Sequence, residues 1–187
     1  MAAKGQAPAK PVMTDAGITA KTGKGWDHWF AALDKAGAAA RDHKGIVAIL
    51  NGKLKVGPWW GQMIAVSYER ARGIRAMNQK CDGEFSVSVT KVMPVGLSAL
   101  FAAATDEKLR KKWFPPGAFE ETSRTADKYW RGKWKKDFRL EIGFYAKGPG
   151  KAQLVLQANK LSGPDAVESE RAAWKKALEK LQTLLAA

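Results

Sequence analysis

Two stretches of the sequence place tryptophan beside basic residues, a combination that can bind nucleic acid. They are GPWWGQMIAVSYERARGIR at residues 57–75 and KYWRGKWKK at residues 128–136. Flat aromatic rings stack on bases, and lysine or arginine holds the phosphate backbone. The two kinds of side chain can act together only if the local backbone puts them on one face.

In the first stretch, helical spacing separates most of these side chains. Pro58 suits the first turn of a helix, because its missing N–H would be unpaired there in any case. At about 100° per residue, one apolar arc holds Trp59, Trp60, Met63, Ile64, Val66 and Ala71, with Ile74 and Met77 extending it. The opposite side holds Glu69, Gln62 and Arg72, and Arg70 alone intrudes on the arc. The pattern favours a packed helix over a platform for bases.

The second stretch alternates in the manner of a strand. Trp130 and Trp134 share one face, whereas Arg131, Lys133 and Lys135 share the other. Because strand geometry puts the tryptophans and the cations on opposite faces, an amphipathic strand is favoured over a nucleic-acid site.

Residues suited to catalysis or metal binding are few. The histidines, His28 and His43, lack ligand spacing, and Cys81 is the single cysteine, so neither a zinc site nor an internal disulfide is expected. The sequence has no G-x-S-x-G, P-loop or G-x-G-x-x-G pattern, and TGKG and KGPGK have glycine and lysine at the wrong spacing. We expect a protein that is not an enzyme, with no catalytic residue, no metal and no cofactor.

The charge of the chain is high but spread out. Of the net charge of +14, residues 1–80 supply 13 Lys or Arg against 5 Asp or Glu, and residues 81–187 supply 19 against 13. Neither half is a concentrated basic arm, so a generic basic surface is favoured and no specific nucleic acid is expected as partner. No apolar run resembles a signal peptide or a membrane span. These features predict a cytoplasmic protein without membrane insertion.

The first half of the chain is predicted to be helical. Helical spacing is found for Trp26, Trp29, Phe30 and Leu33. This spacing predicts a helix over 24–36, and a second apolar run predicts one over 42–51. With the helix that begins at Pro58, they make a three-helix module.

Composition divides the chain into a tail and two domains. Residues 1–21 are rich in Ala, Lys and Pro and predict a disordered tail, and residues 22–79 form the helical module. The polar segment NQKCDGE contains an Asp-Gly turn signal and predicts a linker. Residues 82–187 form the second domain.

In the second domain the apolar period changes to two. Phe85, Val87 and Val89 alternate with polar residues up to Pro94, and two short helices meeting near Thr105-Asp106 follow. Further strands are predicted over 118–124, 126–135, 138–147 and 151–161. The chain ends in its longest helix, whose apolar stripe is Val167, Trp174, Leu178, Leu181 and Leu185. The order predicts an α+β domain.

This order resembles the SRPBCC or START-like superfamily, in the branch related to the activator of the heat-shock-protein-ninety ATPase. The resemblance is carried by FSVSVTKVMPVGLSALFAAATDEKLRKKWFP, DFRLEIGFYAKGPGKAQLVLQANKL and AAWKKALEKLQTLL. The first half resembles an uncharacterised helical domain that accompanies such folds in bacteria. The resemblance implies a helix-grip fold, in which a curved antiparallel sheet wraps the terminal helix and leaves an apolar cavity.

Such a cavity predicts non-enzymatic binding of a hydrophobic small molecule. The candidate lining residues are Trp113, Trp130, Trp134, Phe138, Leu140, Ile142, Phe144, Leu154, Leu156, Trp174 and Leu178. The same aromatic bulk can also fill the space, because protein interiors are close-packed by default. A filled core leaves the alternative of a protein-interaction or chaperone-associated module with a protein partner.

Overall fold

A computed structural model describes residues 10–135 and 137–186. The chain forms two compact units, one ending at Cys81 and the other beginning at Asp82. Each has its own hydrophobic core. Within the described residues, no helix combines the length and the apolar character needed to cross a membrane.

The first unit is helical. Its α-helices are α1 (Asp15–Thr22), α2 (Trp26–Lys35), α3 (His43–Ala48) and α4 (Pro58–Ala71), with a 3-10 turn at Ala38–Ala40 and a π turn at Ile49–Lys53. Their apolar faces meet in a core that includes the fully buried Ile18, Leu33 and Tyr68. Tyr68 also donates a hydrogen bond of 2.7 Å to Asp34 and thereby joins α4 to α2.

Helix α1 lies within the range expected to be a disordered tail. The Thr14 side chain accepts a hydrogen bond from the Gly17 N–H, and Gly23, at a φ of 74°, closes the helix. Ile18 is fully buried in the helical core. For residues 15–21 the expectation was therefore wrong, because two caps and one buried side chain hold a helix that has little apolar periodicity. Residues 1–9 lie outside the described part.

Helix α4 differs from its prediction in its buried face and its end. Its buried residues are Gly61, Ile64, Ala65, Ser67, Tyr68 and Glu69, whereas Trp59 is 71% exposed. Glu69 is 3% exposed because His43 Nδ1, at 3.1 Å, and Arg75, at 2.7 Å, contact its carboxylate. The helix ends at Ala71, before Gly73 at a φ of 66°, so Met77 lies outside it and is exposed.

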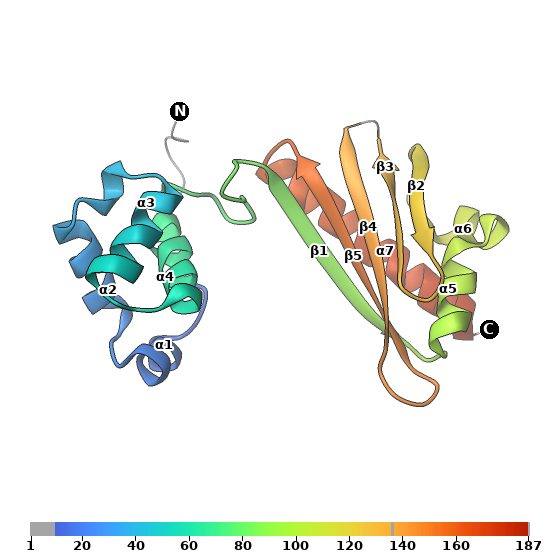
Figure 1. Ribbon diagram of the computed structural model, residues 1–187. Coiled ribbons are helices and arrows are strands. Elements are labelled where there is room, and N and C mark those ends of the chain that lie inside the picture. Colours follow the sequence, from blue (N-terminus) through green and yellow to red (C-terminus); the bar gives the residue numbers. More distant parts are fainter. Residues whose placement is uncertain (1–9, 136, 187) are drawn as a thin grey trace. The chain divides into compact units, whose positions relative to one another are not determined.

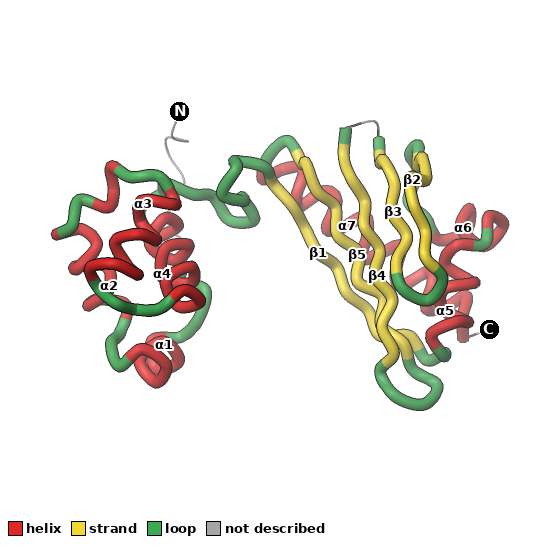
Figure 2. The backbone as a smooth tube through the Cα atoms, in the orientation of Figure 1, coloured by secondary structure: helices red, strands yellow, loops and turns green. Residues whose placement is uncertain are grey.

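The second unit is built on an antiparallel sheet (Figure 2). Its strands are β1 (Phe85–Met93), β2 (Phe119–Thr125), β3 (Tyr129–Trp134), β4 (Phe138–Ala146) and β5 (Ala152–Leu161), in the spatial order β1-β5-β4-β3-β2. Buried and open residues alternate along β3 and β4, so Trp130 and Trp134 face the core with Leu140 and Ile142. The predicted tryptophan face is confirmed.

Three helices complete this unit: α5 (Leu97–Thr105), α6 (Glu107–Trp113) and the long α7 (Pro164–Ala186). Figure 1 shows α7 running behind the sheet, and its buried Val167, Trp174 and Leu178 join the core of the sheet. The arrangement is the predicted helix-grip fold within an α+β chain. The sequence analysis predicts a ligand site in the space between the sheet and α7.

Candidate functional site

The predicted lining residues do come together between the sheet and α7. All but Phe138 are between 0 and 3% exposed and belong to one core, against which the partly buried Phe138 packs. The sheet contributes Trp130, Trp134, Phe138, Leu140, Ile142, Phe144, Leu154 and Leu156, α6 contributes Trp113, and α7 contributes Trp174 and Leu178. These residues pack against one another as the core of the domain.

Phe114, which the sequence prediction missed, lies at the centre of the aromatic part of this core. Its ring centroid lies 4.9 Å from that of Trp174, 5.4 Å from Trp134 and 5.9 Å from Trp130. The ring is only partly buried, although five aromatic rings surround it. Because Phe114 follows the last residue of α6, neither helical nor strand periodicity marked it; the only signal was its place in the sequence WFPPG.

A groove of about 230 Å³ opens beside Phe114. Its lining comprises Arg110, Lys111, Phe114, Pro115, Pro116, Gly117 and Phe119. The loop lies directly on the core, because a Cβ atom at Gly117, whose φ is 153°, would lie 2.6 Å from the Trp134 ring. The Arg110 guanidinium lies 5.9 Å from both the Phe119 and Trp130 ring centroids. The groove therefore combines an aromatic wall with a cation.

The buried carboxylate of Glu170 ties α7 to the sheet. It is 2% exposed and accepts hydrogen bonds of 2.9 Å from the indole N–H groups of Trp134 and Trp174. The Lys135 ammonium lies 2.6 Å from its other oxygen. Lys135 was predicted to share the outer face with Arg131; it instead reaches Glu170, because it sits at a φ of 48° in the turn after β3.

The indole of Trp113 offers a different feature. Its Nε1 is buried and has no hydrogen-bond partner within residues 10–135 and 137–186. Buried donors are normally paired, so this N–H is a donor without an acceptor at the edge of the aromatic cluster. The Trp113 ring contacts Phe114, with centroids 5.0 Å apart.

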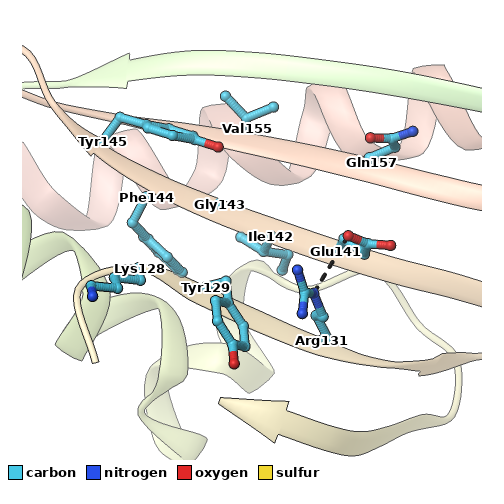
Figure 3. A pocket seen from close by; sticks show the side chains of 10 residues that line it. All are labelled: Lys128, Tyr129, Arg131, Glu141, Ile142, Gly143, Phe144, Tyr145, Val155 and Gln157. Carbon is cyan, nitrogen blue, oxygen red and sulfur yellow. Dashed lines mark ion pairs between the residues drawn. The ribbon is translucent and has the colours of Figure 1, made fainter. Parts of the chain in front are cut away.

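The outer face of the sheet carries a second hollow, of about 430 Å³. Figure 3 shows its lining residues, which are Lys128, Tyr129, Arg131, Glu141, Ile142, Gly143, Phe144, Tyr145, Val155 and Gln157. Tyr129, Gly143 and Tyr145 occupy the positions of β3 and β4 that face away from the tryptophan core. The pairing of Tyr129 with Gly143 makes these residues neighbours on this face.

Groups typical of catalysis are not assembled in the described residues. Within these residues, no three His, Cys, Asp or Glu side chains lie close enough to share a metal ion. Cys81 is exposed, and His43 is engaged with Glu69 and with Gln62, whose oxygen lies 2.8 Å from Nε2. What the geometry offers is a groove beside Phe114 and a hollow on the outer face of the sheet.

No protein-family model and no curated protein matches the chain. Solved structures with a similar fold include an AHSA1-like protein from Rhizobium etli, with 16% identity and a TM-score of 0.43 over 53% of this chain and 80% of that one. They also include the Aha1 dimer from Colwellia psychrerythraea, with 10% identity and a TM-score of 0.47 over 54% and 95%. A protein from Mesorhizobium loti has 16% identity and a TM-score of 0.48 over 54% and 96%. At such identities the likeness concerns the backbone fold and extends to no ligand or partner.

Proposed function

We propose that the second unit binds a hydrophobic small molecule between the sheet and α7, and that the ligand takes the place of the Phe114 ring. The observation that carries the proposal is the position of this ring. Phe114 fills the centre of the aromatic cluster, yet it is only partly buried and comes from a loop. Rotation of one side chain would vacate an aromatic space beside the open groove.

The surroundings of Phe114 define the class of ligand. The walls are the rings of Trp130, Trp134 and Trp174, which favour a flat or elongated apolar body. Arg110 at the groove would attract an anionic end, and the unpaired Trp113 N–H would donate to an acceptor. An apolar molecule with one acidic group meets all these features.

Uptake of anilinonaphthalene sulfonate, an apolar anionic dye, tests the proposal. In Phe114→Ala the space is open from the start, so dye affinity should rise about tenfold, while truncation of this core ring lowers stability by about 3 kcal/mol. The matched control is Phe101→Ala, which removes a ring packed 5.1 Å from Phe144, away from the groove. The control should lose stability without gaining dye affinity.

Two outcomes contradict the proposal. Equal gains in dye affinity in both variants would mean that the dye reports general loosening of the core. The absence of dye uptake by the wild type and by Phe114→Ala would favour the second candidate, a protein-interaction module with a filled core. The near-complete burial of the interior side chains supports that candidate.

A further inference from the structure

The outer hollow of the sheet has an aromatic platform at its floor. A Cβ atom at Gly143 would lie 2.9 Å from both Cε2 and the hydroxyl oxygen of Tyr145, so the Tyr145 ring lies across the backbone of its own strand. Figure 3 shows this ring stretched along β4 toward Gly143. Since Tyr145 is 53% exposed, the other side of the ring is open to a ligand.

A second aromatic group stands on the neighbouring strand. Tyr129 pairs with Gly143 across β3 and β4, and the Arg131 guanidinium lies 4.2 Å from the Tyr129 ring centroid. Arg131 also contacts Glu141 at 3.4 Å, which holds its planar group over this face. The hollow thus presents two phenol rings and one guanidinium, all flat groups on which a base can stack.

The platform lies in the most basic part of the sequence. Residues 128–151 hold eight Lys or Arg against two Asp or Glu, a net charge of +6 within a chain of +14, although one of these cations, Lys135, turns to Glu170 and away from this face. Lys128 lines the hollow itself. Beyond Arg131 and Glu141 the surface continues into an adjoining hollow of about 240 Å³, which Lys133 and Arg139 also line. Cations therefore accompany the rings along the face.

From this geometry we infer that the outer face of β3, β4 and β5 binds single-stranded nucleic acid without sequence preference. One base stacks on Tyr145 in the larger hollow, and the backbone runs past Arg131 toward Arg139. A single strand is favoured over a duplex because bases in a duplex are stacked on each other and cannot reach the tyrosines. The site lies on the face opposite to the Phe114 cluster, so it is independent of the proposed ligand.

Fluorescence anisotropy with a labelled oligothymidylate of about ten nucleotides tests the inference, at about 0.15 M salt. A duplex of the same length is the competitor. We expect the single strand to bind at least about fivefold more tightly than the duplex. Tyr145→Leu should weaken binding about tenfold, because a lost base stack is worth this much or more. Tyr145→Phe keeps the ring and should bind within about twofold of the wild type.

Charge is tested with a matched pair of variants. Arg139→Gln should weaken binding and lower the slope of log affinity against log salt by about 1. Lys180→Gln removes the same charge from an exposed site on α7 and should change neither quantity. Thermal unfolding of the exposed Tyr145 variants verifies that they fold as the wild type does.

Three results would overturn the inference. One is no anisotropy change at about 0.1 mM protein, a concentration sufficient even for non-specific binding. Another is equal affinity of Tyr145→Leu and the wild type. The third is equal weakening by Arg139→Gln and Lys180→Gln, which would mean that net charge alone attracts the oligonucleotide.

Discussion

At the scale of single residues, Glu170 is the polar centre of an aromatic core. Its carboxylate accepts both indole N–H groups and contacts Lys135, so its own charge is paired and its acceptors are used. If the carboxylate is removed, the polar groups that it contacts stay buried and lose their partner, at a place that water does not reach.

Substitution of Glu170 should therefore lower the free energy of unfolding by more than the loss of its packed atoms alone would. Glu170→Ala is expected to lower the free energy of unfolding by about 3–5 kcal/mol, since two buried indole N–H groups lose their acceptor. Glu170→Gln keeps an acceptor oxygen and should lose about 1–2 kcal/mol. Urea unfolding measures both values; equal losses would show that the hydrogen bonds contribute nothing beyond the ion pair.

Trp174 allows a related prediction. Trp174→Ala should lower the free energy of unfolding by about 3–5 kcal/mol, because a fully packed ring leaves a cavity behind. Trp174→Phe keeps most of the ring and loses the bond to Glu170, so its loss should be smaller. If Trp174→Ala lost less than about 1 kcal/mol, the ring would line open space and would not fill the core.

Tyr68 makes the stability of the first unit sensitive to alkaline pH. Burial, followed by the hydrogen bond to Asp34, raises the pKa of Tyr68 from 10.0 to about 12. Because the folded-state pKa is the higher one, the neutral phenol stabilises the fold in full below pH 10, and this contribution is lost as pH rises through about 12.

The measurement compares the wild type with Tyr68→Phe in urea at about pH 9 and about pH 11. The wild type should lose more stability than the variant between these values. A parallel decline of the two proteins would place the alkaline sensitivity in other groups.

At the scale of elements, Gly132 fixes how closely β2 approaches β3. A Cβ atom there would lie 2.4 Å from Phe119 Cε2 and 2.5 Å from the Glu120 carbonyl oxygen, so the backbone of β2 itself would have to move. Gly132→Ala should destabilise the second unit and speed amide exchange along β2. At Gly143 the obstacle is the movable end of Tyr145. Gly143→Ala is therefore the matched control, and equal exchange rates in the two variants would contradict this account.

Most elements of the second unit were predictable from the sequence because alternation is strong in them. Phe138, Leu140, Ile142 and Phe144 are alternate residues of β4, and all four lie in the core or pack against it. Phe114 and Glu170 were missed for different reasons: Phe114 lies in a turn, where no period applies, and Glu170 is a charged residue buried by partners distant in sequence. The buried face of α4 was misjudged because Glu69, like Glu170, is a charged residue that its partners bury; they are His43 and Arg75.

At the scale of the whole molecule, each unit holds its own core, so the second should fold without the first. A fragment of residues 82–187 is expected to unfold cooperatively and to show a sheet signal in circular dichroism. A fragment without either property would mean that the helical unit completes the second core.

The eight tryptophans divide equally between the units, with Trp26, Trp29, Trp59 and Trp60 in the first and Trp113, Trp130, Trp134 and Trp174 in the second. All four in the second unit are at most 1% exposed, whereas Trp59 is 71% exposed. Indole emission shifts to longer wavelength in water, so the native spectrum should contain a short-wavelength component from the buried tryptophans of both units, Trp26 and Trp29 included, and a longer one from Trp59. An aqueous quencher should remove the long-wavelength component first. Loss of either core should convert its short-wavelength emission to long-wavelength emission, so the chain carries an intrinsic optical label in each of its two cores.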